Sequence, residues 1–502
     1  MTTTTHVRPG SRGRAEGPGV AQPPDPAAPR LALSRALSVP FVLAMVAVLP
    51  GWVATQPGPG ARDAVFWLQL TLCCYAGARL SAMVLTARRR LIQGSFWLFV
   101  YIAMGIAPLA QAVLDRVPTP VVGPRSDTVL ATALVLLGVV AFDVGALLAR
   151  HRPAPRGRSR TATVHRTRLY VLIAFAFAAS ALMVVQLGGL GVFFSSRQEI
   201  SASVADATGT TGAGAAASQA GSAFLRGFGT VPALIALLFT TRWLVTSRVA
   251  RRRPLVLALW TGLLALNAVV NNPVSNPRYW FLTVLFALLF TAFPRSPVMY
   301  RNALALGAVI ALVVFPFADR FRYAEDGGPD HQTESVLVPL TLKDYDQIGM
   351  FANTVSFAEA GEGHTYGRQL SGTLLFFVPR SVWDGKPEDS GVRVGKWMGM
   401  RNTNLSSPLW AELWLDFGPL GMAAGLAGAG YLAARADRRY VRRTVDDTGP
   451  GNVLAVVVPM VAGYSFILLR GPLLQATGRI AIAALCLALV TTFRPDPRKL
   501  LR

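Results

Sequence analysis

The sequence predicts an all-α polytopic membrane protein with about twelve transmembrane helices. Hydrophobic residues make up 52% of the 502-residue chain and charged residues only 15%, a balance that favours the membrane class over the soluble one. Apolar runs of about 18 or more residues recur, and a helix of that length crosses a hydrocarbon core of roughly 30 Å. Lys and Arg gather in alternate connections between these runs, as they do in proteins that cross a membrane repeatedly.

The apolar runs define the expected organisation of the chain. It comprises a disordered cytoplasmic tail (1–35), transmembrane helices 1–9 (36–318), an extracytoplasmic loop (319–408), transmembrane helices 10–12 (409–493) and a cytoplasmic tail (494–502). The first tail is rich in Pro, Gly, Ala, Thr and Arg and lacks apolar periodicity, which predicts disorder. It is also too long and polar for an ordinary cleaved signal peptide, so the first run is expected to remain as a helix. The predicted spans are 36–54, 64–87, 91–114, 128–149, 169–188, 222–246, 255–271, 279–294, 302–318, 409–432, 452–470 and 479–493.

The charge distribution predicts the orientation of these spans. One set of alternating connections, which includes both tails, carries most of the 49 Lys and Arg and few of the 26 Asp and Glu. Because Lys and Arg are enriched on the cytoplasmic side, both termini of this cell-membrane protein are expected in the cytoplasm. The net charge of +23 is therefore a topology signal, and nucleic acid is not expected as a partner.

The cysteines predict neither a disulfide framework nor a metal site. Cys73, Cys74 and Cys486 all fall within predicted spans and show no CxxC-type spacing. The chain also lacks an ATP or sugar-nucleotide motif. We therefore expect no metal and no cofactor.

The longest extracytoplasmic connection, 319–408, is the expected catalytic loop. Its segment LTLKDYDQIGMFANTVSFAEAG (340–361) predicts an amphipathic helix on the membrane face or under a cavity. A second short helix is expected from Arg368, ended by Pro379. The polar stretch FFVPRSVWDGKPEDSG (376–391) follows. Long connections in compact proteins are usually functional or disordered, and this composition favours function.

A group of cations is predicted on the extracytoplasmic side, where such residues are normally depleted. One interpretation is that their side chains extend to the membrane interface. The other is that they bind a phosphate-bearing lipid headgroup, because guanidinium groups pair well with phosphate oxygens. The substrate-binding candidates are Arg197, Arg278, Arg320, Arg322, Arg368, Arg380 and Lys386, with Arg393 and Lys396 nearby.

Three residues are candidate general bases. His364, in GEGHTYG, carries an imidazole that accepts a proton near neutral pH. Asp346, in KDYDQ, is an alternative, although an acid there also complements a helix dipole. Glu412 enters a span four residues before Asp416, so the two acids share one helix face.

Two features inside the predicted spans have simple structural interpretations. Arg79 and Asp143 are expected to neutralise each other between helices, and a proton relay is the alternative. The small residues of FGPLG (417–421) are expected to allow close packing.

Two segments together resemble a known family. VPRSVWDGKP, followed about twenty residues later by NTNLSSPLWAELWLDFGPLG, resembles the O-antigen polymerases, the Wzy class of oligosaccharide repeat-unit polymerases. The matching positions are Pro379, Arg380, Trp383, Lys386, Pro387, Glu412, Gly418 and Gly421. The resemblance covers about 270–430, and the first half matches only in hydropathy and in the GGLGVFFSSRQEI loop.

The resemblance implies a glycosyltransferase fold of the GT-C type. It also implies metal-independent joining of undecaprenyl-pyrophosphate-linked oligosaccharides into a surface polysaccharide outside the cell membrane. Arg380 would then bind the pyrophosphate, and Trp383 would stack on sugar or insert at the bilayer edge. His364, Glu412 or Asp346 would be the base, and a flippase and a chain-length regulator would be partners.

Three other functions remain open from the sequence. An O-antigen ligase would share the architecture and the lipid donor. A lipid-linked oligosaccharide flippase also has about twelve helices, but it normally needs more charge within the membrane than this chain carries. A secondary transporter is disfavoured because the two halves show no evident repeat.

Overall fold

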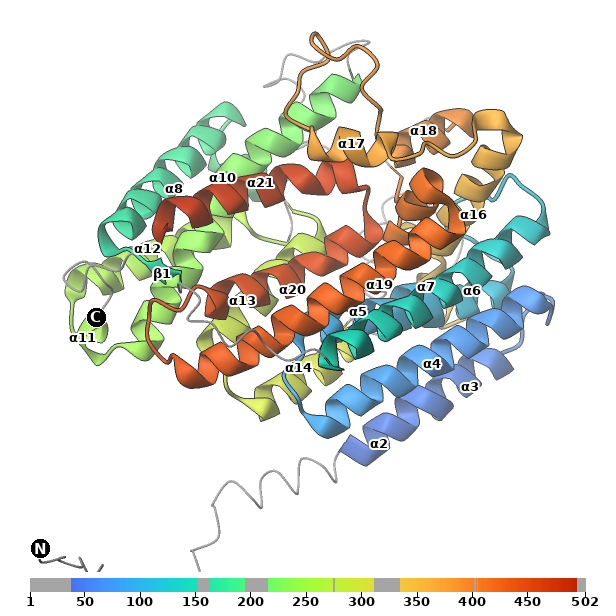
Figure 1. Ribbon diagram of the computed structural model, residues 1–502, viewed down its shortest axis with the longest axis horizontal. Helices are drawn as coiled ribbons and strands as arrows, with labels where there is room; N and C mark the ends of the chain where they lie inside the picture. The colour runs from blue at the N-terminus through green and yellow to red at the C-terminus, as the bar shows by residue number, and fades with distance from the viewer. Residues whose placement is uncertain are drawn as a thin grey trace, which may run out of the picture.

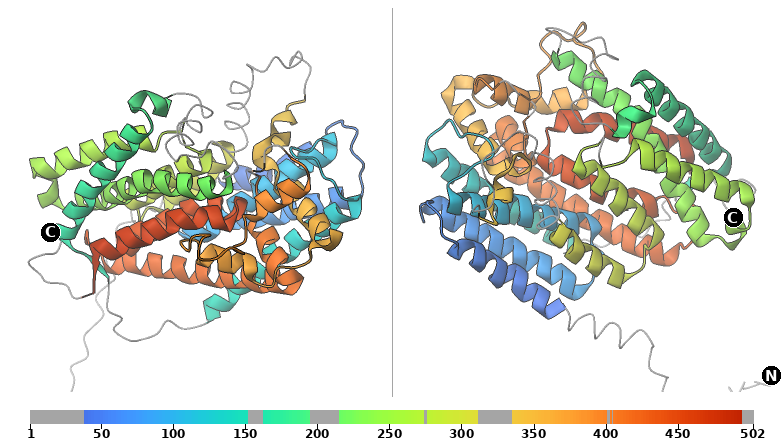
Figure 2. Two further views of the ribbon diagram at one scale, coloured as in Figure 1. Left: turned by 90° about the horizontal axis from the view of Figure 1, so that it is seen from above. Right: turned by 180° about the vertical axis from the view of Figure 1, so that it is seen from behind.

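The computed structural model describes residues 38–151, 162–194, 215–273, 276–310, 335–400, 403 and 405–493. These residues form an all-α bundle with a single pair of short strands (Figures 1 and 2). Within them, seven helices are long and apolar enough to cross a membrane: Ala64–Thr86, Leu91–Leu114, Arg125–Arg150, Arg166–Gln186, Arg226–Thr246, Leu409–Asp446 and Leu473–Val490. The predicted class of helical membrane protein is thus supported.

The helices follow the predicted spans in order. The first half contains α2 (Ser38–Leu43), η1 (Ala44–Val48), α3 (Leu49–Thr55), α4 (Ala64–Thr86), α5 (Leu91–Phe99), η2 (Val100–Ile106), α6 (Ala107–Leu114), α7 (Arg125–His151), α8 (Arg166–Gln186), η3 (Leu190–Phe194) and α10 (Ala215–Thr246). The second half contains α11 (Arg248–Arg251), α12 (Pro254–Val270), α13 (Arg278–Ala292), α14 (Pro297–Val309), η7 (Val338–Thr341), η8 (Lys343–Tyr345), α16 (Gln347–Phe357), η9 (Ala358–Glu362), α17 (Arg368–Leu374), α18 (Ser390–Trp397), α19 (Leu409–Asp446), α20 (Leu454–Arg470) and α21 (Leu473–Val490).

The chain uses local signals to begin and end these helices. Asp63 caps α4 by accepting a hydrogen bond from the Phe66 amide at 3.2 Å, which satisfies a donor that the helix leaves unpaired. Ala87 ends the same helix in the left-handed conformation, with φ of 47°. The sharp stop fits the polar Arg88–Arg90 segment that follows.

Close packing of α7 against α19 joins the two halves of the sequence. A Cβ atom at Gly145 would lie 1.8 Å from the carbonyl oxygen of Ala427, and one at Gly430 would lie 2.0 Å from that of Phe142. Only glycine fits at these two positions, as at close helix crossings in membranes generally.

Helices α16, α17 and α18 lie together at one end of the bundle, which we call the cap end (Figures 1 and 2). The opposite end carries the strands β1 (Thr163–Val164) and β2 (Thr491–Thr492), which pair antiparallel. The amphipathic interpretation of 340–361 is wrong for α16, because every one of its residues is buried. Helix α17 begins at Arg368 as predicted but ends at Leu374, five residues before Pro379.

Candidate functional site

The two acids of α19 anchor the cap to the bundle. The Asp416 carboxylate accepts hydrogen bonds from the amides of Gln369 and Leu370, at 3.0 and 2.7 Å, and from the Thr365 hydroxyl. It therefore caps α17 from another helix. Glu412, one turn earlier, accepts a hydrogen bond from the hydroxyl of Ser390, the first residue of α18.

Asp389 caps α18 from within its own segment. Its Oδ1 accepts hydrogen bonds from the amides of Gly391 and Val392, at 3.0 and 3.4 Å. Burial raises the pKa of this carboxyl to about 7, against the lowering effect of those hydrogen bonds. A carboxyl of this kind carries a proton under mildly acidic conditions.

His364 lies against a break in α19. Gly418 has φ of 66° and ψ of −170°, and Pro419 follows it inside the helix. The His364 ring meets Trp414 edge to face, with centroids 4.9 Å apart, and its Nε2 lies 3.6 Å from where a Cβ at Gly418 would be. FGPLG is thus a helix break as well as a packing site.

The three candidate bases differ in burial and in hydrogen bonding. Glu412 and Asp346 are each 4% exposed. Glu412 binds Ser390, whereas Asp346 accepts a hydrogen bond from Ser406 at 2.7 Å. Burial raises the pKa of Asp346, with Arg470 opposing the shift. The His364 ring is half-buried, and its Nδ1 is a buried nitrogen without a hydrogen-bond partner among the described residues, so it is the one candidate of the three whose titrating group is not held by a hydroxyl.

The cations of the cap loop bind backbone carbonyls. Lys386 donates to the carbonyl oxygens of Phe376 and Val378, at 2.6 and 2.8 Å. Arg380 donates to the carbonyl of Lys386 at 2.9 Å. Burial lowers the pKa of Lys386, and the charge of Arg380 lowers it further. The two carbonyl contacts of Lys386 stabilise the loop.

Arg368 and Arg380 retain binding capacity. Arg368 is exposed and donates to the carbonyl of Gly385 at 2.7 Å. A guanidinium group has five N–H donors, so one carbonyl contact leaves either arginine able to bind phosphate. Trp383 is half-buried in the same loop.

Arg278 and Arg470 share one aspartate at the cap end of α13 and α20. Asp344 lies 3.4 Å from Arg278 and 3.3 Å from Arg470. Arg470 also lies 4.0 Å from Asp346 and 5.3 Å from the ring centre of Tyr279. Asp344 is therefore a bridge between cations. Arg197, Arg320 and Arg322, also predicted to bind substrate, lie outside the described residues.

Arg479 is a candidate that the sequence analysis missed. Its guanidinium lies 4.4 Å from the ring centre of Trp280 in α13. A Cβ at Gly227 of α10 would lie 3.6 Å from its Cγ. It forms no ion pair or hydrogen bond with any residue that the structure describes.

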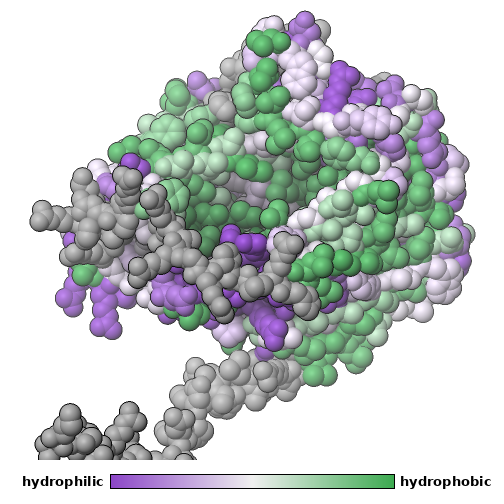
Figure 3. Space-filling model, viewed as in Figure 1, coloured by the Kyte–Doolittle hydropathy of each residue, from purple (hydrophilic) through white to green (hydrophobic). Residues whose placement is uncertain are grey.

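Arg479 was overlooked because hydropathy misplaced the start of α21. The hydropathy pattern placed the start of the last span at 479, so Arg479 was not considered as a residue within a helix. Helix α21 begins at Leu473 instead, so Arg479 lies about 9 Å along it at 1.5 Å per residue. On the face shown in Figure 3 the molecule is hollowed between α19 and α21, and much of the hollow is lined by apolar side chains.

The intramembrane pair was predicted correctly. Arg79 lies 2.5 Å from Asp143, and the Tyr75 hydroxyl donates to the same carboxylate at 2.6 Å. The guanidinium also lies 5.5 Å from the ring centre of Trp97. The two charges neutralise each other between α4 and α7.

Comparisons of the chain with protein-family models, curated proteins and solved structures found no match. Among the described residues, no group of three or more His, Cys, Asp or Glu side chains is arranged to hold a metal ion. The site comprises a set of arginines, a half-buried imidazole and a cap fixed to α19 by two carboxylates.

Proposed function

We propose that this protein is a membrane glycosyltransferase with about twelve spans and a GT-C-type fold. It joins undecaprenyl-pyrophosphate-linked oligosaccharide repeat units into a surface polysaccharide on the outer face of the cytoplasmic membrane, where the cap lies. The observation that carries this proposal is Arg479, a cation well inside an apolar helix with no acid partner among the described residues. Such a residue is costly in a membrane unless it binds something.

A phosphate group is the ligand that suits these arginines best. Arg479, Arg380 and Arg368 present paired donors that match phosphate oxygens. In the proposed reaction the acceptor hydroxyl oxygen bonds to the anomeric carbon as the bond from that carbon to the pyrophosphate breaks. Negative charge then grows on the departing pyrophosphate, and nearby guanidinium groups stabilise the transition state.

His364 is the proposed base. It accepts the proton that the acceptor hydroxyl loses, which balances the reaction without a metal or a cofactor. Glu412 and Asp346, the other candidates, act instead as buried supports of the cap. Gly418, where the helix backbone breaks, lies against the His364 ring and positions it.

A flippase is the second candidate, because Arg479 inside the membrane would also suit movement of a lipid phosphate between leaflets. A ligase would use the same donor site with a different acceptor. An assay in which the lipid-linked repeat unit is the only substrate distinguishes these functions, because only a polymerase joins repeat units to one another.

The test uses purified protein in liposomes with its lipid-linked repeat unit, analysed by mass spectrometry. A ladder of products spaced by one repeat is expected. Arg479→Gln should lower the rate about 10- to 100-fold, since hydrogen bonds to charged groups contribute about 1.5–3 kcal/mol.

Arg435→Gln is the matched control. Arg435 also lies beside an aromatic ring, that of Tyr431, but near the opposite end of the bundle, and its loss should leave the ladder unchanged. Unchanged substrate that has moved between leaflets would show a flippase and overturn the proposal. A ladder formed at the full rate by Arg479→Gln would remove Arg479 from the site.

A further inference from the structure

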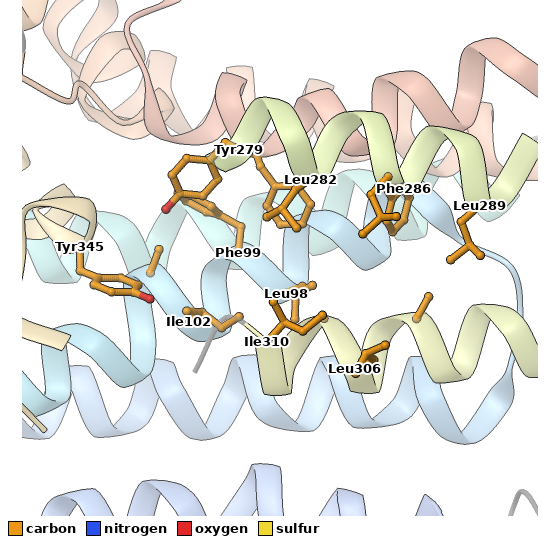
Figure 4. A pocket seen from close by; sticks show the side chains of 15 residues that line it. Leu98, Phe99, Ile102, Tyr279, Leu282, Phe286, Leu289, Leu306, Ile310 and Tyr345 are labelled. Carbon is orange, nitrogen blue, oxygen red and sulfur yellow. The ribbon is translucent and has the colours of Figure 1, made fainter. Parts of the chain in front are cut away.

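A second feature of the bundle lies on the other side of α13 from Arg479. It is a groove between α13, α14 and the π-helical turns of η2 (Figure 4). Leu282, Phe286 and Leu289 of α13 face Leu306 of α14, and Ile310 directly after that helix, across it. Among the residues that the structure describes, no charged side chain lines the groove.

One end of the groove is polar. The hydroxyls of Tyr279 and Tyr345 lie at the same end, away from Leu289 (Figure 4). The Tyr279 hydroxyl donates to the carbonyl oxygen of Asp344 at 3.5 Å, and the Arg470 guanidinium lies over the Tyr279 ring. The groove therefore opens beside the cluster in which Arg278 and Arg470 share Asp344.

The size of the groove limits what it accepts. Its free volume is about 120 Å³, close to that of a cavity of roughly 150 Å³ that holds one benzene ring. One branched five-carbon unit fits such a space, and two acyl chains side by side do not. A long apolar slot with phosphate-binding groups at one end matches a single-chain phosphorylated lipid.

We infer that this groove binds the chain of a polyprenyl phosphate or diphosphate lipid, with the phosphate at Arg278 and Arg470. The inference rests on the proposed function and extends it. Arg479 packs on Trp280, whereas the groove uses Tyr279 and Leu282, so α13 separates two lipid-phosphate sites. One site would hold the donor and the other the acceptor.

The charge of the cluster provides a test that distinguishes phosphate binding from a purely structural role. Asp344 occupies both arginines, so an incoming phosphate competes with it. Asp344→Asn removes this competitor, leaves Asp346 at 4.0 Å from Arg470, and is expected to tighten lipid binding several-fold. If Asp344 only holds α13 and α20 together, the same change weakens binding or leaves it unaltered.

The groove itself is tested by filling it. Ala303 of α14 lines the groove, and Ala305, two residues along the same helix, does not. Binding of undecaprenyl phosphate to the full chain in nanodiscs is measured by native mass spectrometry. Ala303→Phe should weaken it at least tenfold, and Ala305→Phe should change it less than twofold.

A photo-crosslinking amino acid provides a test that does not depend on filling the groove. Placed at Leu306, it should label undecaprenyl phosphate more strongly than at Leu257, which is 40% exposed on α12. Phosphatidylglycerol, with two chains, should compete poorly at Leu306. Equal labelling by both lipids would show a general lipid contact and overturn the inference.

The two proposals fail in different ways. A product ladder together with unaltered lipid binding in Ala303→Phe would overturn the groove and leave the polymerase standing. Selective lipid binding that Ala303→Phe abolishes, without any ladder, would keep the groove and overturn the polymerase.

Discussion

Asp416 shows how one side chain organises a distant segment. It accepts two backbone hydrogen bonds at the start of α17 and one from Thr365. Removing a cap typically costs about 1 kcal/mol, and buried donors left without partners cost about 1–3 kcal/mol each. Asp416→Ala should therefore lower the free energy of unfolding of the cap by about 2–4 kcal/mol.

Hydrogen exchange measured by mass spectrometry locates this effect. Protection should fall over 364–375 and stay unchanged in α4. Asp416→Asn, which keeps one acceptor oxygen, should show a smaller loss. Equal loss of protection throughout the bundle would contradict a local capping role.

Asp389 makes stability depend on pH. Its folded pKa of about 7 lies above the ordinary value of 3.8, so the folded state binds the proton more tightly than the unfolded state. Stability should therefore fall as pH rises from about 4 to 7 and level off above that. Asn also caps helices well, so Asp389→Asn should remove this slope and be more stable than wild type at pH 8.

Unfolding midpoints in detergent between pH 4 and 8 measure the difference. Asp384→Asn is the control, because Asp384 is exposed in the same loop. Parallel profiles for wild type and Asp389→Asn would contradict the assignment.

Individual contacts were the least predictable level from the sequence. The Arg79–Asp143 pair could be inferred because two lone charges in apolar runs require partners. The pairing of Arg278 with Asp344 joins residues from separate helices, and no local sequence pattern predicts it. Lys386 was predicted to bind phosphate, but its ammonium donates hydrogen bonds to two carbonyl oxygens of its own loop.

The break in α19 depends on one glycine. With φ of 66° and ψ of −170°, Gly418 occupies a region that is essentially restricted to glycine. Gly418→Ala should lower the free energy of unfolding by about 1–3 kcal/mol and displace His364, so activity should fall more than stability. Gly428→Ala is the matched control: nothing lies within 4 Å of its added Cβ, and its helical backbone gains about 0.5–1 kcal/mol.

Thermal unfolding and the product ladder separate the two effects. Equal behaviour of Gly418→Ala and Gly428→Ala in both measurements would show that the break has no special role.

Helix positions followed well from hydropathy, whereas helix ends did not. The start of α21 at Leu473 was hidden because Gln475 and Arg479 interrupt the apolar run that hydropathy detects.

The architecture of the bundle was the most predictable level. A backbone in a bilayer must pair within helices or closed barrels, and apolar runs of about 18 or more residues are typical of helices, so the sequence predicts an all-α fold. How α7 meets α19 depends on Gly145 and Gly430, whose partners lie far away in the chain. Hydropathy cannot register such a pairing.

The strand pair at the end opposite the cap predicts the effect of truncation. Thr163 pairs with Thr492, and Val164 with Thr491. A chain ending at Val490 loses β2 and should unfold at a lower temperature, with faster proteolysis near 163. A chain ending at Phe493 keeps the strand and should behave like the full-length protein; equal proteolysis of both would contradict a stabilising role.

This strand pair also sets an order of events during synthesis. Thr491 and Thr492 leave the ribosome after every described helix has been made, yet their partners emerged more than 300 residues earlier. Strand β1 therefore waits for β2 while the helices insert, and residues 451–452, which also bond to it, are made first. A nascent chain that stalls before β2 is made therefore leaves β1 without this partner, as an edge that quality-control proteases can reach.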